Sequence, residues 1–217
     1  MRPWVPWAIG GVVVGGLVAL VARSKASASA PATPLVVSGD RVVLVGDSIG
    51  QGLAPHLAVM LPSLGIVFAS SHAGVPLVVK SLTATGLLPL LKAHAAAFAD
   101  TRTAILSIGS NDAATNDPAT EAKTLQDIVA FLRDAGVDEI VWASPPNFRL
   151  PPQKVPSPAT AAKQNAFDAL LTRGLVDRRI VPSDAVVSEI APDRVHLTPA
   201  GYSTYASQIA VALTEPA

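Results

Sequence analysis

The sequence has 217 residues, of which 50% are hydrophobic and only 15% are charged, and its formal net charge is zero. This composition excludes intrinsic disorder for the bulk of the chain, because disorder requires low hydrophobicity and high net charge. No basic run exceeds Arg178-Arg179, so the basic patch of a nucleic-acid-binding protein is missing and no nucleic-acid partner is expected. The absence of cysteine excludes disulfides, thiolate metal sites and a cysteine nucleophile.

The N-terminal 23 residues differ in composition from the rest and are predicted to be a membrane anchor or a signal segment. Pro3 to Ala22 form an uncharged run of 20 residues, the length that a helix needs to cross the core of a bilayer. A cleaved secretory signal is the alternative, although its apolar region usually has only about 7–15 residues. Residues 24–40 are rich in Ser, Ala and Pro, which is typical of a linker. We therefore expect an anchor or signal over residues 1–23, a linker over 24–40 and one folded domain over 41–217.

From residue 41 onward, short β-branched runs alternate with longer helical stretches. Strands are predicted over residues 41–45, 66–69, 103–108, 139–143 and 179–181. Helices are predicted over residues 50–61, 87–98, 118–133, 158–173 and 199–213, with Gly136 ending the third and a loop over 144–157. This alternation predicts βαβ units and a mainly parallel sheet covered by helices on both faces. The expected fold is a three-layer α/β/α domain of flavodoxin-like architecture, preceded by an N-terminal hydrophobic helix.

Polar residues and small residues follow the predicted strands, and another polar group lies near the C-terminus. These stretches are Gly46-Asp47-Ser48, Ser70 to Gly74, Gly109 to Asp112, and Asp193 to His196. Ligands of open α/β sheets bind beyond the carboxyl ends of the strands, where we expect these stretches to meet. A hydroxyl, backbone N–H donors, a carboxamide and a carboxylate–imidazole pair are the groups that acyl transfer requires.

The same stretches resemble the sequence blocks of the SGNH hydrolase superfamily, also called GDSL-type esterases. Gly46-Asp47-Ser48-Ile49 resembles the first block, with Ile in place of the usual Leu, and Gly74 falls at the glycine of the second block. Gly109-Ser110-Asn111-Asp112 matches Gly-x-Asn-Asp of the third block, and Asp193 to His196 matches Asp-x-x-His of the fifth. The blocks occur in the family's order and extend, with the continuation of the last one to Tyr202, over almost the whole predicted domain.

The resemblance implies a role for each matching residue. Ser48 would attack an ester carbonyl, His196 would take the proton of Ser48, and Asp193 would hold the imidazole in the required tautomer. The backbone N–H groups of Ser48 and Gly74 and the side-chain amide of Asn111 would form an oxyanion hole. The resemblance implies neither a metal ion nor another cofactor.

Structural interpretations of these residues remain open at this point. Ser48 could cap the following helix, and Gly109 to Asp112 could be an ordinary turn before a helix. Asp193 and His196 could form a surface pair. His72, in the same loop as Gly74, is a further candidate for lining the pocket.

The expected protein is a serine esterase that hydrolyses a carboxylic ester, and the expected substrate is an acetyl ester on a carbohydrate or cell-envelope glycan. One alternative is a lysophospholipase or thioesterase that acts on lipid acyl esters. Another is a non-catalytic envelope or virion binding protein that keeps the fold. The uncharged apolar run from Pro3 to Ala22 predicts that the protein is anchored to a membrane or exported to the cell envelope, on the periplasmic or extracellular side.

Overall fold

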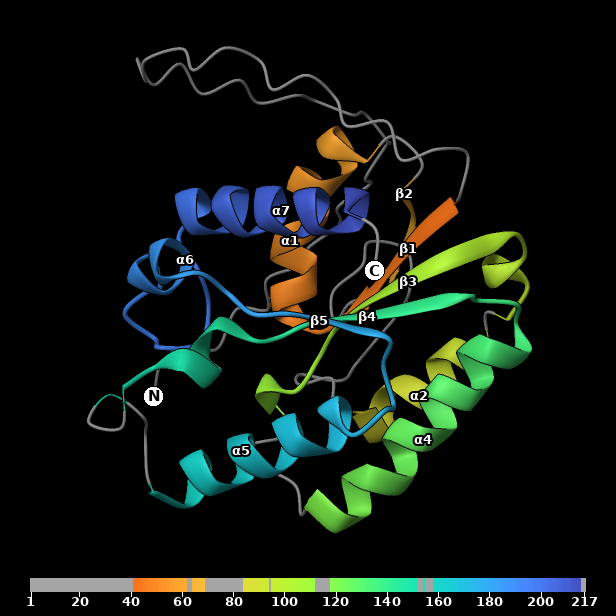
Figure 1. Ribbon diagram of the computed structural model, residues 1–217, viewed down its shortest axis with the longest axis horizontal. Coiled ribbons are helices and arrows are strands. Elements are labelled where there is room, and N and C mark those ends of the chain that lie inside the picture. Colours follow the sequence, from red (N-terminus) through yellow and green to blue (C-terminus); the bar gives the residue numbers. More distant parts are fainter. Residues whose placement is uncertain are drawn as a thin grey trace, which may run out of the picture. The chain divides into compact units, whose positions relative to one another are not determined.

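Five parallel strands form the central sheet in a computed structural model of the chain (Figure 1). The structure describes residues 41–61, 64–68, 84–93, 95–111, 118–151, 154 and 158–215. The strands are β1 (Arg41–Gly46), β2 (Leu64–Phe68), β3 (Thr101–Ser107), β4 (Glu139–Ala143) and β5 (Arg178–Ile180). Their order across the sheet is β2-β1-β3-β4-β5. Every predicted strand is present within a few residues, and the predicted parallel α/β fold is confirmed.

Helices cover both faces of this sheet. The described α-helices are α1 (Ser48–Met60), α2 (Ala84–Ala93), α4 (Pro118–Asp134), α5 (Pro158–Thr172), α6 (Asp184–Ser188) and α7 (Pro199–Thr214). Helices α1, α6 and α7 lie on one face of the sheet, and α2, α4 and α5 lie on the other (Figure 1). The predicted three-layer arrangement is therefore confirmed for the described part of the chain.

Strand β1 separates two apolar cores because its side chains point alternately to the two faces of the sheet. Val43 and Val45 belong to the cluster beneath α2 and α4, whereas Val42 and Leu44 belong to the cluster beneath α1 and α7. All four side chains are 0–1% exposed. Burial on both faces explains why this strand is a continuous apolar run in the sequence.

The helix predicted over residues 87–98 is divided in the structure. Helix α2 ends at Ala93, and the 3₁₀ helix η1 (Ala95–Phe98) follows it. Phe98 is fully buried and packs edge-on against Phe131 of α4, with ring centroids 5.5 Å apart. The change from α-helix to the tighter 3₁₀ turn accompanies this contact with another helix. Hydrophobic periodicity along a single segment cannot predict such a contact.

Two short elements were not predicted. The 3₁₀ helix η2 (Pro146–Arg149) lies within the predicted loop over 144–157, and α6 has only five residues. Such lengths are too short to produce a recognisable helical period. Gly136, in contrast, terminates α4 as predicted, because its φ of +93° is a left-handed conformation that glycine adopts without strain.

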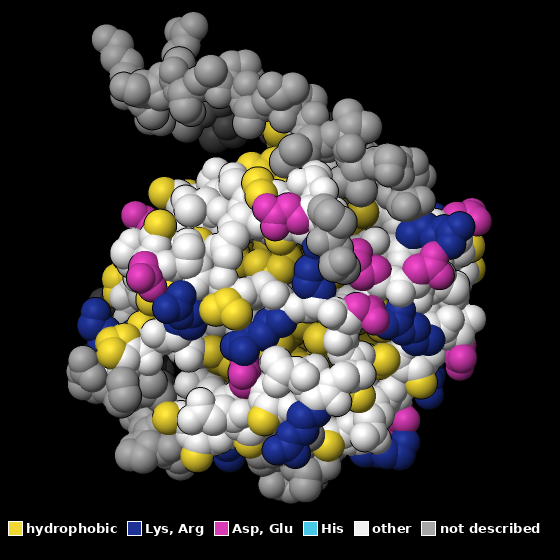
Figure 2. Space-filling view, viewed as in Figure 1, with side chains coloured by type: hydrophobic (Ala, Val, Ile, Leu, Met, Phe, Trp, Pro, Cys, Tyr) yellow, Lys and Arg dark blue, Asp and Glu magenta, His cyan; other side chains and the backbone are white. Residues whose placement is uncertain are grey.

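The predicted anchor or signal segment and the linker lie outside the described residues, so both stay predictions. No helix within the described ranges is both long and apolar enough to cross a bilayer. The described residues all belong to one compact unit, Thr33–Ala217. Basic and acidic side chains are interspersed over the face of this unit that Figure 2 presents.

Candidate active site

The candidate site lies where the direction of the strand order reverses, between β1 and β3. Helix α1 begins at Ser48, directly after β1, and Asn111 follows β3 by four residues. At such a switch point the two connections leave toward opposite faces of the sheet, which opens a crevice at the carboxyl ends of the strands. The order of the strands therefore brings the first and third sequence blocks together.

Gly46 allows the ends of β1 and β3 to approach closely. It pairs with Ser107 in the parallel ladder, and the next amide, that of Asp47, donates a 3.0 Å hydrogen bond to the Ser107 carbonyl. A Cβ atom at residue 46 would lie 2.6 Å from that carbonyl oxygen. A backbone oxygen cannot move aside as a side chain could, so this position requires glycine.

Asp47 caps α1, and the interpretation of Ser48 as the cap is wrong. The Asp47 residue has extended backbone angles, and its Oδ1 atom accepts a 2.9 Å hydrogen bond from the amide of Ile49. Ser48 is consequently the first residue of the helix, and its half-buried hydroxyl remains available for another contact.

The Ser48 hydroxyl lies against an imidazole from the other end of the domain. The Nε2 atom of His196 is 2.8 Å from Ser48 Oγ, and its Nδ1 atom is 2.7 Å from Asp193 Oδ2. An Nδ1–H that donates to the carboxylate leaves Nε2 free to accept the proton of the hydroxyl. The structure therefore brings together Ser48, His196 and Asp193 in the order that nucleophilic catalysis requires.

A tight bend between α6 and α7 carries Asp193 and His196. The bend is closed by a bridge between Ile190 and Leu197 and by a 2.8 Å hydrogen bond from the Ala191 amide to the His196 carbonyl. Arg194, at the tip, has a left-handed φ of +61°. An arginine in this region is strained, so the surrounding contacts hold the bend in this conformation.

Hydrogen bonds favour the ionised form of Asp193. Partial burial disfavours the charge, but amide hydrogen bonds from Val195 and His196, together with the His196 ring, more than compensate and lower the pKa of Asp193 below its ordinary value. The side chains of Asp193 and His196 remain 50% and 41% exposed. The bend thus presents a charged carboxylate and a solvent-accessible imidazole to Ser48.

Asp47, next to Ser48, is a buried carboxyl group to which the sequence assigned no role. Its Oδ2 atom is buried and has no hydrogen-bond partner among the described residues. Burial raises the pKa of Asp47 to about 7, although the amides of Ile49 and Gly50 and the nearby His196 act in the opposite direction. The signal that could have revealed this group is its position between a buried strand and a helix.

Asn111 lies beside a buried polar pair that sequence reasoning also missed. The Ser110 hydroxyl donates a 2.8 Å hydrogen bond to Oδ1 of Asn147, and both side chains are at most 7% exposed. The pair joins the segment after β3 to η2, after β4, and thereby fixes the backbone on which Asn111 sits. Gly74, Asp112 and His72 lie outside the described residues, so the second oxyanion donor stays a prediction.

No protein-family model matches the chain, and neither does any curated protein sequence. Solved structures do match. The C-terminal catalytic domain of the peptidoglycan O-acetyltransferase OatA from Streptococcus pneumoniae has a TM-score of 0.55 at 20% identity, over 80% of this chain and 92% of that one. The acetyl xylan esterase AlAXEase has a TM-score of 0.57 at 14% identity, over 79% and 98% of the two chains.

Axe2, an acetylxylan esterase from Geobacillus stearothermophilus, has a TM-score of 0.55 at 16% identity, over 82% of this chain and 96% of that one. The parallel sheet of the described residues is the architecture that the sequence blocks imply, and the matched structures share this fold. The chain has the three-layer α/β fold of the SGNH hydrolases.

Proposed function

We propose that this protein is a serine esterase in which Ser48, His196 and Asp193 form the catalytic triad. The observation that carries the proposal is the continuous chain of contacts from Ser48 Oγ through the His196 ring to Asp193, at 2.8 and 2.7 Å. Nucleophile and base lie within hydrogen-bond distance of each other, and a third group orients the base.

The first half of the reaction transfers the acyl group to Ser48. The Ser48 oxygen attacks the ester carbonyl as its proton passes to Nε2 of His196, and the imidazolium is stabilised by Asp193. The tetrahedral intermediate then breaks its bond to the alcohol oxygen, which takes the proton from Nε2 and leaves. The products of this half are an alcohol and an acyl ester of Ser48.

In the second half, water attacks the acyl ester and gives its proton to Nε2. Cleavage of the bond to Ser48 releases the carboxylic acid, and the proton returns to the serine oxygen. The Ser48 amide, at the N-terminus of α1, favours the negative oxygen of both intermediates. The side-chain amide of Asn111 and the backbone N–H of Gly74 complete the proposed oxyanion hole.

For the substrate, we infer an acetyl ester on a carbohydrate or cell-envelope glycan. The names of the matched structures support this, since they include acetylxylan esterases and a peptidoglycan O-acetyltransferase. The exposure of His196 and Asp193 also suits a group carried on a large polymer, because a deep enclosure would exclude it. A lipid acyl ester is the second candidate, supported by a lipase among the matched structures.

The test compares Ser48→Ala with Ser207→Ala, which changes an exposed serine of α7. We expect wild type and Ser207→Ala to hydrolyse p-nitrophenyl acetate and to react with a fluorophosphonate probe. In Ser48→Ala, turnover should fall by several orders of magnitude and labelling should be lost, with an unchanged circular dichroism spectrum.

A second experiment distinguishes the glycan substrate from the lipid substrate. Faster hydrolysis of p-nitrophenyl acetate than of p-nitrophenyl palmitate, together with acetate release from acetylated xylan or peptidoglycan, would favour the glycan, and the reverse preference would favour the lipid. Absence of ester hydrolysis by the wild type would favour the non-catalytic binding protein.

For the location, we propose that residues Pro3 to Ala22 anchor the protein to a membrane. The support is the length of the run and its lack of charge. The full chain should partition with membranes and resist carbonate extraction, whereas a chain beginning at Val37 should be soluble and equally active on a small ester. A mature N-terminus at Ser29 or Pro31 would instead show that the segment is a cleaved signal.

A further inference from the structure

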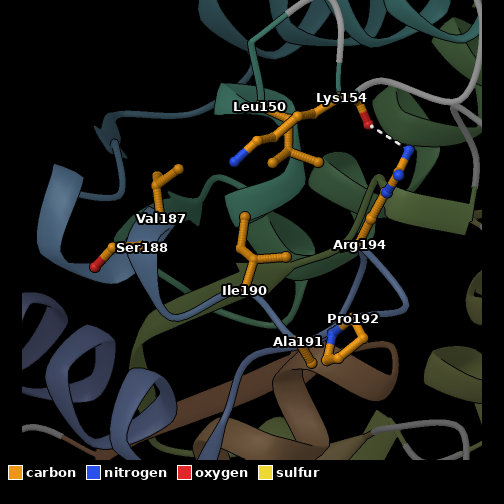
Figure 3. Close-up of a pocket in the computed structure, with 8 residues that line it drawn as sticks. All are labelled: Leu150, Lys154, Val187, Ser188, Ile190, Ala191, Pro192 and Arg194. Atoms are coloured by element: carbon orange, nitrogen blue, oxygen red, sulfur yellow. Dashed lines mark hydrogen bonds between the residues drawn. The ribbon is translucent and has the colours of Figure 1, made fainter.

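A cavity of about 380 Å³ adjoins the bend that carries Asp193 and His196 (Figure 3). Its wall includes Leu150 and Lys154, which follow η2, together with residues from the end of α6 and the first part of the bend. The apolar lining includes Leu150, Val187, Ile190 and Pro192. The volume lies at the lower end of the range of small-molecule sites, and it suits a ligand portion of a few carbon atoms.

Two cationic side chains also line this cavity. Lys154 and Arg194 are both exposed, and Figure 3 shows the Lys154 side chain extending across the apolar residues. The Arg194 guanidinium donates a 3.4 Å hydrogen bond to the backbone carbonyl of Lys154, which links the two residues. An aliphatic surface beside two cations is complementary to an organic anion.

The carboxylates near the cavity are already engaged. Asp193 accepts hydrogen bonds from Val195 and His196. The Glu189 carboxylate accepts from the Thr198 hydroxyl. Among the described residues, neither Lys154 nor Arg194 forms an ion pair with a carboxylate. Their positive charge is therefore available to a ligand.

The position of the cavity relates it to the proposed catalytic residues. Pro192 and Arg194 line it and are the chain neighbours of Asp193. Asp193 is in turn linked to Ser48 through the His196 ring, by contacts of 2.7 and 2.8 Å. A substrate with its ester at Ser48 reaches the cavity by extending past the side chains of His196 and Asp193, which are 41% and 50% exposed.

We propose that this cavity binds an anionic group carried by the ester substrate, with Lys154 and Arg194 as the residues that select for negative charge. The inference rests on the proposed esterase function and specifies its substrate class: an ester with a carboxylate or phosphate attached through a short aliphatic or cyclic body.

The test uses two pairs of esters that differ only in charge. Mono-p-nitrophenyl adipate and its methyl ester place the charge on the acyl side, and 4-acetoxybenzoate and its methyl ester place it on the alcohol side. The ratio of kcat/KM for the anionic ester to that for its neutral partner is measured in wild type, Lys154→Gln and Arg194→Gln. Lys92→Gln is the control, because it removes another exposed lysine, from α2 on the other face of the sheet.

We expect a preference for the anion in at least one pair, which also identifies the side of the ester that enters the cavity. Each of the two variants should reduce this ratio about two- to fivefold through KM, as an exposed ion pair allows, and 0.5 M salt should reduce it further. The ratio should be unchanged in Lys92→Gln. Any general loss of activity in Lys154→Gln or Arg194→Gln acts on both esters of a pair and cancels in the ratio. Hydrolysis of the neutral esters with an unchanged ratio in both variants would overturn this inference alone. Hydrolysis of none of the four esters would overturn the proposed function together with it.

Discussion

The Nε2 atom of His196 lies 2.8 Å from the hydroxyl oxygen of Ser48, although 148 residues separate them along the chain. The contact depends on the packing of α1, which begins at Ser48, against α7, which begins three residues after His196. Between the helices, the ring of Tyr202 occupies the space beside Gly52, where a Cβ atom would lie 2.2 Å from the ring carbon Cζ. The missing side chain at Gly52 thus lets the Tyr202 ring of α7 lie directly against α1.

Gly52→Ala should move Tyr202 and loosen the Ser48–His196 contact. The overpacking should cost about 1–3 kcal/mol of folding free energy, partly offset by the higher helix propensity of alanine. Turnover should fall more than substrate binding, because the distance between nucleophile and base changes. Chemical denaturation and steady-state kinetics measure the two effects. Val59→Ala, at a residue of α1 that is 76% exposed, is the control, and equal kinetics in both variants would argue against this role for Gly52.

Asp193→Asn should reduce kcat by about 10⁴, the loss seen when the orienting carboxylate of such a triad becomes an amide. The asparagine can still accept from the Val195 and His196 amides, so the bend should persist. The amide no longer favours the imidazolium or the required tautomer. Kinetics with p-nitrophenyl acetate give the effect, and Asp127→Asn, at a surface ion pair of α4, is the control. A decrease in kcat of less than tenfold would mean that Asp193 stabilises the bend and does not orient the imidazole.

Asn111→Ala should reduce turnover by roughly 10²–10³ with little change in KM, because an oxyanion donor acts on charge that develops in the transition state. Asp112→Asn should have a much smaller effect. The Ser110–Asn147 pair remains in both variants, so the free energy of unfolding should change little. Equal losses of activity in the two variants would show that Asn111 is not the specific donor.

The raised pKa of Asp47 predicts that the stability of the protein depends on pH. Burial raises this pKa from the ordinary value of 3.8, which applies to the unfolded chain, to about 7 in the folded protein. Between these two pH values the folded state therefore holds a proton that the unfolded state has released. The free energy of unfolding should therefore decrease as the pH rises from about 4 to about 7, by at most about 1.4 kcal/mol per pH unit, and then level off.

Asp47→Asn keeps an acceptor for the Ile49 amide and removes the titrating group, so this part of the slope should disappear. Urea denaturation of both proteins at several pH values between 4.5 and 8 measures the difference. Parallel curves for wild type and variant would mean that Asp47 is already ionised across this range.

Local patterns in the sequence determined the strands, most of the longer helices and the identity of the candidate residues. The β1 strand is apolar because both of its faces are buried, and this burial is visible as a continuous run without any knowledge of its neighbours. Because ligands of parallel sheets bind at the strand ends, Ser48 and Asn111 could be selected from their positions alone. The spacing of Asp193 and His196 likewise places both in one short bend.

Only the tertiary structure decided features that depend on groups distant along the chain. The burial of Asp47, which raises its pKa, exists only in the folded chain, where the Asp47 amide bonds to the Ser107 carbonyl of β3. The pairing of Ser110 with Asn147 likewise joins segments that follow two different strands. The break after Ala93 accompanies a ring contact with another helix. Desolvation, cavity shape and ion pairing depend on everything within a few ångströms of a group. Sequence periodicity reports only which face of a segment is buried, and not what it is buried against.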